Sequence, residues 1–265
     1  MKRLFFALLL FSLFWLKTEL SQATVIGDAV REIDKASVLI TTKCEYIFKL
    51  KEAGSATVTK RAVFMGNGFF IEHQSAPHLV ATARHVVSCQ QTPPDRFFDD
   101  KFKLEQAASF KVNVFVSINY KGTNFPATVT LRDFNDNPEI DLVFMEVILP
   151  QGFAHGHNPV LTDAGSYDIG TEVIVRGFMP AGGGAWLMRL KVTKLENIAE
   201  KALLLQLNTP AYSGMSGSPI LLWKDGRYFV IGILIIKFES EEEGVHDVSF
   251  ATLFKKEYFD MPSGK

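Results

Sequence analysis

The chain has 265 residues, of which 47% are hydrophobic and 22% are charged, and its formal net charge is −1. This composition is typical of a globular protein with a substantial core, and the length fits one two-lobed unit rather than two domains. The charge is nearly balanced and forms no basic stripe, so we expect no nucleic-acid partner.

The first 23 residues are predicted to be a secretory signal peptide. Lys2 and Arg3 precede an apolar run at 4–16, and residues 21–23, Ser-Gln-Ala, offer the small side chains at which a signal peptidase cleaves. The run has 13 residues, fewer than the roughly 20 that a transmembrane helix needs. We therefore expect no stable membrane anchor and a mature protein exported to a periplasm or out of the cell.

The mature chain is expected to begin with a short amphipathic helix at residues 25–35, where apolar side chains recur at helical spacing. Segments rich in Val, Ile, Phe and Thr follow, with turn residues between them. Residues 90–110 contain two adjacent prolines and mixed charge, and are predicted to be a surface loop. Strands are predicted in the first half at 36–42, 46–50, 61–72, 79–83, 112–119, 127–134 and 142–148.

Residues 150–170 carry several glycines and two prolines, which is typical of a connection between lobes. Asp225-Gly226 predicts a tight hairpin between two later strands. The pattern predicts an all-β protein whose first lobe spans 24–150 and whose second spans 151–265. Strands in the second lobe are predicted at 172–180, 185–195, 202–207, 220–223, 227–238 and 248–254.

Three polar residues at strand boundaries are candidate catalytic groups. His85 follows one predicted strand, Asp141 opens another, and Ser216 lies in a glycine-flanked loop between two more. A serine nucleophile needs a histidine base, and the base needs a carboxylate that orients it. Each residue alone is more often structural, but the order His, Asp, Ser together with the three positions predicts a catalytic triad.

The same loop is a candidate oxyanion hole. Gly214 and Gly217 allow the chain to turn tightly around Ser216. The backbone N–H groups of Gly214 and Ser216 can then converge on one oxygen atom, which is the arrangement that stabilises a tetrahedral intermediate.

These motifs resemble the trypsin-like serine proteases, and they are most similar to the bacterial HtrA/Deg and glutamyl-endopeptidase types. The resemblance implies two packed six-stranded antiparallel β-barrels with the triad at their junction. It also implies hydrolysis of peptide substrates through an acyl-enzyme, with no metal or organic cofactor. The segments that carry it are Gly-Asn-Gly-Phe at 66–69, Thr-Ala-Arg-His-Val-Val at 82–87, Asp-Leu-Val at 141–143, Gly-Phe-Met-Pro at 177–180 and Gly-Met-Ser-Gly-Ser-Pro at 214–219.

The chain departs from these families in two places. Met215 stands where animal digestive members have an aspartate that receives the new N-terminus, so activation by that salt bridge is not expected. The chain also ends about a dozen residues after its last predicted strand, where HtrA-type proteins usually carry a peptide-binding PDZ domain. This departure gives no support for an HtrA-like cage.

The resemblance places the primary specificity pocket along residues 227–238. Leu234 stands where glutamyl endopeptidases have a histidine, and Pro210 where trypsin has its aspartate. An unpaired charge is costly to bury, so preference for an acidic or a basic residue is not expected. We predict an apolar pocket with Leu234, Ile236 and Ala211 as walls, which accepts a small or medium aliphatic side chain.

The two cysteines, Cys44 and Cys89, either form a disulfide or remain buried thiols, and the sequence leaves both open. His155 and His157 are a weak metal candidate, because no third ligand lies at a zinc-like spacing. The acidic run 241–243 is more typical of a solvated loop than of a calcium site. We predict no bound metal.

Two functions remain open from the sequence. The first is an exported serine endopeptidase that acts on proteins or peptides. The second is a protease-like barrel that serves as a binding module, with the triad residues present but the site closed. The sequence leaves the oligomeric state open.

Overall fold

The computed structural model describes residues 26–28, 30–51, 56–72, 78–89, 97–98, 103, 107–128, 140–162, 168–179, 184–199, 202–208, 212, 214–235 and 249–259. The predicted signal segment, residues 1–23, lies outside these ranges. Within them, every helix is too short or too polar to cross a membrane.

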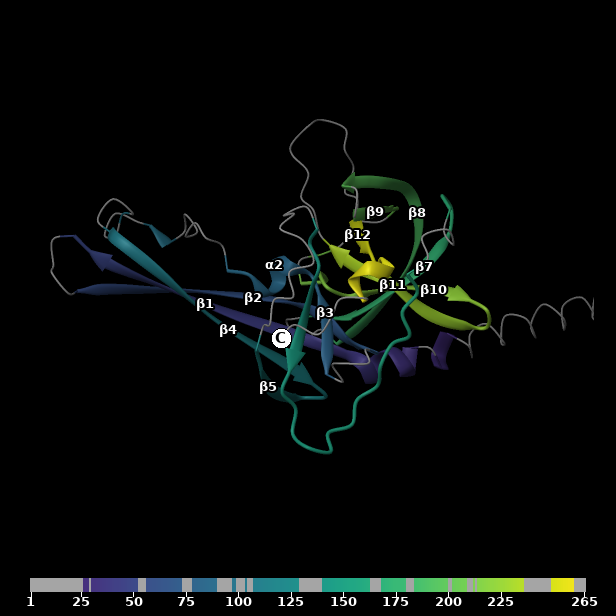
Figure 1. Ribbon diagram of the computed structural model, residues 1–265, viewed down its shortest axis with the longest axis horizontal. Helices are drawn as coiled ribbons and strands as arrows, with labels where there is room; N and C mark the ends of the chain where they lie inside the picture. Colours follow the sequence, from purple (N-terminus) through teal and green to yellow (C-terminus); the bar gives the residue numbers. More distant parts are fainter. Residues whose placement is uncertain are drawn as a thin grey trace, which may run out of the picture.

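The first half of the chain forms a closed antiparallel barrel with the strand order β1-β2-β3-β6-β5-β4 (Figure 1). A short helix, α2 (Arg84–Val87), directly follows β3. The strands of this barrel are β1 (Ser37–Leu50), β2 (Thr57–Ile71), β3 (Leu79–Thr82), β4 (Ala107–Tyr120), β5 (Thr123–Thr128) and β6 (Val143–Val147).

The second half forms another closed barrel with the order β10-β11-β12-β9-β8-β7. Its predicted hairpin is confirmed: Asp225 and Gly226 join β10 to β11 with positive φ angles of 50° and 82°. A 3-10 turn, Lys256–Tyr258, follows the last strand. The strands are β7 (Glu172–Phe178), β8 (Ala185–Ala199), β9 (Ala202–Leu207), β10 (Pro219–Lys224), β11 (Arg227–Ile235) and β12 (Ser249–Leu253).

The two six-stranded antiparallel barrels confirm the predicted fold class. The strands predicted at 36–42 and 46–50 are one strand, β1, because its polar residues Lys43 and Glu45 face away from the buried side and do not interrupt it. Strand β4 begins at residue 107, inside the predicted loop 90–110. Strand β5 begins at residue 123, four residues before the strand predicted at 127–134.

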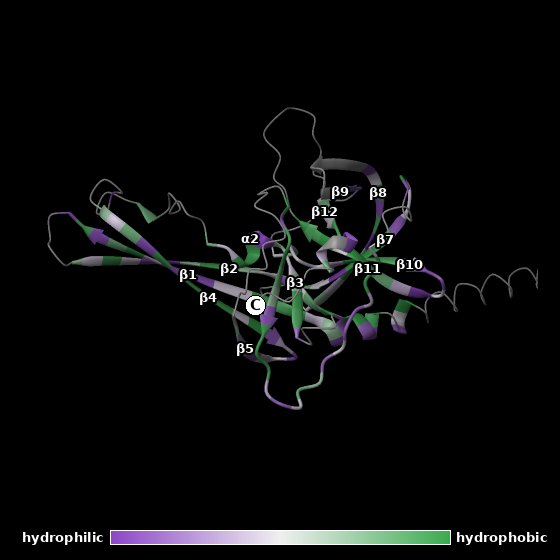
Figure 2. Cartoon of the chain, viewed as in Figure 1, coloured by the Kyte–Doolittle hydropathy of each residue, from purple (hydrophilic) through white to green (hydrophobic). Residues whose placement is uncertain are grey.

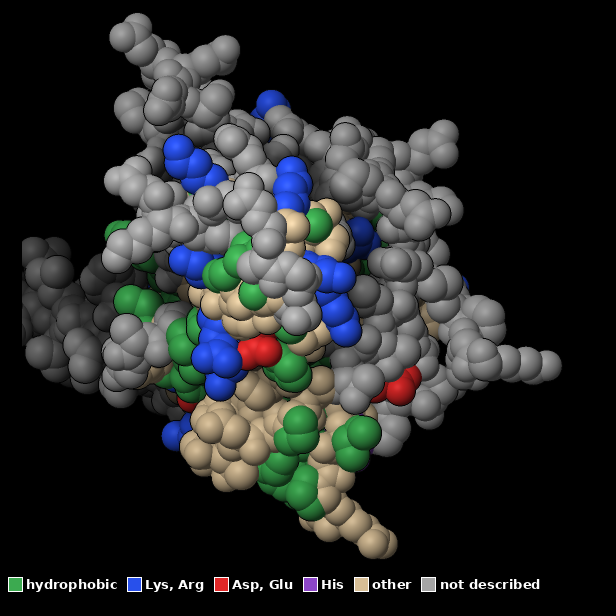
Figure 3. Space-filling model, turned by 90° about the vertical axis from the view of Figure 1, so that its left-hand side faces the viewer, with side chains coloured by type: hydrophobic (Ala, Val, Ile, Leu, Met, Phe, Trp, Pro, Cys, Tyr) green, Lys and Arg blue, Asp and Glu red, His purple; other side chains and the backbone are tan. Residues whose placement is uncertain are grey.

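The outer parts of β1, β2 and β4 extend beyond the first barrel as a three-stranded arm, formed by residues 43–50, 57–63 and 107–114 (Figure 1). Hydrophilic and hydrophobic residues alternate along its strands (Figure 2). One face of β1 packs Tyr46 and Phe48 into a small cluster with Phe97. The opposite face carries the exposed hydrophobic side chains of Val63 and Phe115, which pair with Lys43. The view onto the end of the molecule that carries the arm shows hydrophobic side chains beside Lys and Arg side chains (Figure 3).

Cys44 and Cys89 form a disulfide, with their Cα atoms 5.8 Å apart. The sequence left a disulfide and two buried thiols open, and the structure confirms the disulfide. The bond joins the base of the arm to the segment that follows α2. Because Cys89 is the fourth residue after His85, the disulfide fixes the chain next to a candidate catalytic residue.

A helix of residues 26–28 and 30–36 precedes β1 and spans the junction of the two barrels. Ile33 packs into the core of the first barrel. Asp34 accepts two hydrogen bonds from the Arg176 guanidinium on β7, at 2.9 and 2.8 Å. The core itself crosses the junction, since Ile233 and Phe254 belong to the same buried cluster as the first barrel.

We expect loss of the disulfide to lower the free energy of unfolding by about 2–4 kcal/mol, because the bond closes a loop between cysteines 45 residues apart. Urea denaturation of a Cys44→Ala/Cys89→Ala variant against the oxidised protein measures this. A reductant should move the wild-type midpoint toward that of the variant and leave the variant unchanged. Equal midpoints for variant and oxidised wild type would contradict the expectation.

Candidate active site

His85 is carried by α2, a single helical turn that begins directly after strand β3. Val86 and Val87 are buried in the first-barrel core and anchor the turn. The side chain of His85 points the other way and is 47% exposed. The sequence placed His85 at the end of a strand, and the structure adds the helical turn that presents its ring at the surface.

Asp141 lies beside His85 because β6, which follows Asp141, pairs with β3, which precedes His85. One carboxylate oxygen accepts a hydrogen bond from the backbone N–H of His85 at 2.9 Å. The other is hydrogen-bonded to Nδ1 of the same ring. Two contacts to one residue fix the orientation of the imidazole and leave Nε2 as the nitrogen that is free to exchange a proton.

Ser216 lies on the loop that leads into β10, and it is only 3% exposed. The loop is tightly folded: Met215 donates its N–H to the carbonyl of Tyr212 at 3.0 Å, and Gly217 donates to the carbonyl of Leu234 at 2.8 Å. In the described part of the chain, the Ser216 hydroxyl makes no hydrogen bond to His85. Hydrogen bonds between catalytic groups are often long without substrate and tighten when it binds.

The two barrels are in direct backbone contact beside Ser216. The backbone N–H of Asn67 on β2 donates to the carbonyl of Ser216 at 2.7 Å. Gly217 has a φ of +84°, and a Cβ atom there would collide with the carbonyl oxygen of Asn67 and the hydroxyl of Thr82. This position requires glycine for its backbone conformation and also for the close contact.

The residues predicted to line the primary pocket are only partly described. Leu234 is 1% exposed and packs with Met215 in the core of the second barrel. Pro210, Ala211 and Ile236 lie outside the described residues. The aliphatic pocket therefore stays a prediction.

The structure adds His78 to the histidine pair that the sequence singled out. His78 Nδ1 lies 2.8 Å from His155 Nε2, and the His155 ring stacks on Phe70 at a centroid distance of 3.7 Å. Burial lowers the pKa of His155; the hydrogen bond to the Gly156 carbonyl opposes this effect, and the neighbouring His157 and His78 add to it. Among the described residues, no group of three acidic, histidine or cysteine side chains is arranged to hold a metal ion.

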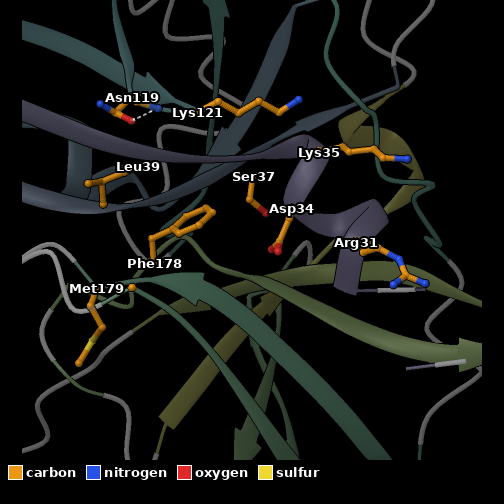
Figure 4. Close-up of a pocket in the computed structure, with 11 residues that line it drawn as sticks. Arg31, Asp34, Lys35, Ser37, Leu39, Asn119, Lys121, Phe178 and Met179 are labelled. Atoms are coloured by element: carbon orange, nitrogen blue, oxygen red, sulfur yellow. Dashed lines mark hydrogen bonds between the residues drawn. The ribbon is translucent and has the colours of Figure 1, made fainter. Parts of the chain in front are cut away.

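A pocket of about 520 Å³ lies between the N-terminal helix, the β4–β5 turn and the end of β7 (Figure 4). None of His85, Asp141 and Ser216 lines this pocket. Its walls combine apolar side chains with charged and polar ones, and the charged side chains are Arg31, Asp34, Lys35 and Lys121.

Residues 66–233 match the sequence model of the trypsin-like peptidase domain, which covers more than half of the chain. The chain belongs to the trypsin-like peptidase family. The match includes His85, Asp141 and Ser216. The N-terminal helix and the last strand of this trypsin-like peptidase lie outside the matched residues.

Two solved structures of a variant of the HtrA-type protease AlgW are similar to this trypsin-like peptidase. One contains a decapeptide and has a TM-score of 0.56 and 13% sequence identity; the match covers 88% of this chain and 64% of the AlgW chain. The other contains a tripeptide and has a TM-score of 0.52 and 15% sequence identity; the match covers 88% of this chain and 60% of the AlgW chain. The chain thus spans less than two thirds of their length, and at this identity the likeness is one of fold. No curated protein sequence matches significantly.

We expect Gly217→Ala to lower the free energy of unfolding by about 3 kcal/mol or more, because it combines a positive φ with a backbone collision at the barrel junction. Gly226→Ala is the matched control, since Gly226 has a φ of +82° but open space around its Cβ position. It should cost about 1–2 kcal/mol. Equal losses in chemical denaturation would contradict the close contact.

Proposed function

We propose that this trypsin-like peptidase is an exported serine endopeptidase that hydrolyses peptide bonds in proteins or peptides through an acyl-enzyme. The observation that carries the proposal is the double contact between Asp141 and His85, through Nδ1 of the ring and the backbone N–H. It occurs in a chain that belongs to a peptidase family and has a serine in a tight glycine-flanked loop across the barrel junction.

In the proposed mechanism, the Ser216 hydroxyl attacks the carbonyl carbon of the scissile bond while Nε2 of His85 accepts its proton. Asp141 holds Nδ1–H and stabilises the imidazolium that forms. The imidazolium then protonates the leaving amine, which breaks the peptide bond and leaves an ester on Ser216. Water, deprotonated by the same imidazole, hydrolyses the ester and restores the serine.

The proposed oxyanion donors are the N–H groups of Gly214 and Ser216. Within the described part of the chain, neither donates a backbone hydrogen bond, which leaves both available to a substrate oxygen. One such donor contributes roughly 3 kcal/mol of barrier lowering. Gly214 has a φ of +90°, a conformation that glycine adopts without strain.

Export is part of the same proposal. It rests on the predicted signal peptide at 1–23 and is supported by the disulfide, because disulfides persist mainly in oxidising compartments. The mechanism requires no cofactor, since the protein side chains and backbone supply every proton transfer and the charge stabilisation.

One observation favours a second candidate function. Ser216 is 3% exposed and makes no hydrogen bond to His85 within the described residues. A protease-like binding module with a closed site would have this arrangement, and reactivity of the serine distinguishes the two.

We expect Ser216→Ala and His85→Ala each to lower kcat by about 10³-fold or more, with little further loss in the double variant, because a triad acts as a unit. Hydrolysis of a peptide substrate by the mature protein measures this. A serine-directed phosphonate should label the wild type and leave Ser216→Ala unlabelled. Full activity in Ser216→Ala would reject the mechanism, and an unlabelled wild type would favour the binding module.

We expect the enzyme to cleave after small or medium aliphatic residues, because an apolar pocket has no partner for a buried charge. The preference between neighbouring aliphatic residues should be modest, about 10- to 200-fold, since one methylene contributes roughly 1–3 kcal/mol. Profiling with a peptide library measures it. Dominant cleavage after Glu, Asp, Lys or Arg would show that the pocket is lined by other residues than those predicted.

A further inference from the structure

Asn67 places a polar side chain at the junction of the two barrels, although the residue is only 1% exposed. It belongs to β2 of the first barrel, yet its side-chain hydrogen bonds all go to the second. Nδ2 donates to the carbonyl of Gly214 at 2.8 Å and to the carbonyl of Phe178 at 3.2 Å. Oδ1 accepts from the N–H of Phe178 at 2.7 Å.

The pair of hydrogen bonds to Phe178 fixes the orientation of the Asn67 amide. Phe178 is the last residue of β7, and it lines the pocket at the barrel junction (Figure 4). The N–H and the carbonyl of Phe178 are both hydrogen-bonded to the Asn67 side-chain amide. The amide thus makes the two backbone hydrogen bonds that a residue of a neighbouring strand would make. With the amide held in this way, the second Nδ2 hydrogen is directed at Gly214.

The backbone of Asn67 holds the other side of the serine loop. Its N–H donates to the carbonyl of Ser216 at 2.7 Å. One residue therefore holds the carbonyl groups of Gly214 and Ser216, on either side of Met215. The peptide unit between them carries the N–H of Ser216, one of the two proposed oxyanion donors. Gly214 has no side chain to restrict its backbone, so its conformation depends on contacts of this kind.

Met215 makes this contact from the first barrel more important. It stands where digestive members of the family have an aspartate that forms an ion pair, and a thioether cannot form one. Met215 is buried in the second-barrel core, and its sulfur accepts a hydrogen bond from the Tyr212 N–H at 3.0 Å. The loop is thus anchored by packing on one side and by Asn67 on the other.

We propose that Asn67 is a positioning residue that holds the oxyanion loop, residues 214–217, in its active geometry from across the barrel junction. The inference rests on the proposed serine-protease function. Asn67 touches no reacting atom and acts through the backbone of Gly214 and Ser216. Donors that are held in place before the reaction stabilise the oxyanion without reorganisation. Loss of the Asn67 hydrogen bonds therefore lowers the rate of the chemical step.

Asn67→Asp tests the proposal, because the two side chains have nearly the same shape. The substitution replaces the donating NH2 group with an oxygen that faces the carbonyls of Phe178 and Gly214. We expect kcat for a short peptide substrate to fall about 10- to 100-fold. This decrease is no larger than the decrease in kcat that follows removal of one oxyanion donor. KM should change by less than about threefold, because a weaker hold on the oxyanion donors acts on the chemical step and not on substrate binding.

Asn158→Asp is the matched control. Asn158 is also buried, at 3% exposure, and it forms an isolated bridge with Ile71 next to the lobe connection. Its Nδ2 has no hydrogen-bond partner among the described residues, so the same chemical change there removes no contact to the oxyanion loop. We expect it to keep the wild-type kcat.

Thermal melting shows whether each variant is folded at the assay temperature. If Asn67→Asp does not fold, Asn67→Ala removes the same donors without adding a charge and is measured in its place. The rate of labelling by a serine-directed phosphonate should fall in parallel with kcat, because the adduct places an oxygen in the same hole. This second readout does not depend on release of product.

A folded Asn67 variant with wild-type kcat would overturn the inference, and so would an equal loss of kcat in Asn158→Asp. In both cases the proposed protease function would still be supported if the wild type is active and the Ser216→Ala variant is inactive. A wild-type protein that neither cleaves peptides nor reacts with the phosphonate would overturn the proposed function and this inference together. Loss of kcat in the Asn67 variant alone supports the positioning role.

Discussion

The backbone contact between the two barrels at Asn67, Ser216 and Gly217 is the constraint on which the candidate site depends. His85 and Asp141 belong to the first barrel and Ser216 to the second, so any contact between them depends on how the two barrels approach each other. A hydrogen bond of 2.7 Å from Asn67 to the Ser216 carbonyl sets that approach. Glycine at 217 makes it possible, because any side chain there would occupy the space of the Asn67 carbonyl.

Apolar packing contributes more to holding the barrels together than the ion pair beside it. The Asp34–Arg176 pair is bidentate and largely buried, so the cost of removing both charges from water offsets much of their attraction. By contrast, one buried core cluster extends from the first barrel to Ile233 and Phe254 of the second. Each fully buried side chain of this size contributes roughly 1.5–3 kcal/mol. The polar contacts at the junction therefore determine its geometry more than its strength.

Buried amides show the difference between a positioned and an unpartnered polar group. A buried donor without a partner costs about 1–3 kcal/mol. Asn158 leaves its Nδ2 unpartnered within the described residues, whereas Asn67 uses both its Nδ2 and its Oδ1 in hydrogen bonds to the other barrel. A polar residue whose contacts are this specific tolerates little displacement, which suits a role beside the proposed oxyanion donors.

The sequence alone determined the strand-rich pattern, the hairpin at 225–226 and the order of His85, Asp141 and Ser216 at the ends of elements. These features are local: alternation, turn residues and neighbouring motifs act over a few positions along the chain. Only the tertiary structure decided that Cys44 bonds to Cys89, that His78 joins His155, and that Asn67 holds residues 111 and 147 positions away. The physical reason is that barrel closure and docking bring distant backbone groups within hydrogen-bond distance, and no local pattern encodes which groups will meet.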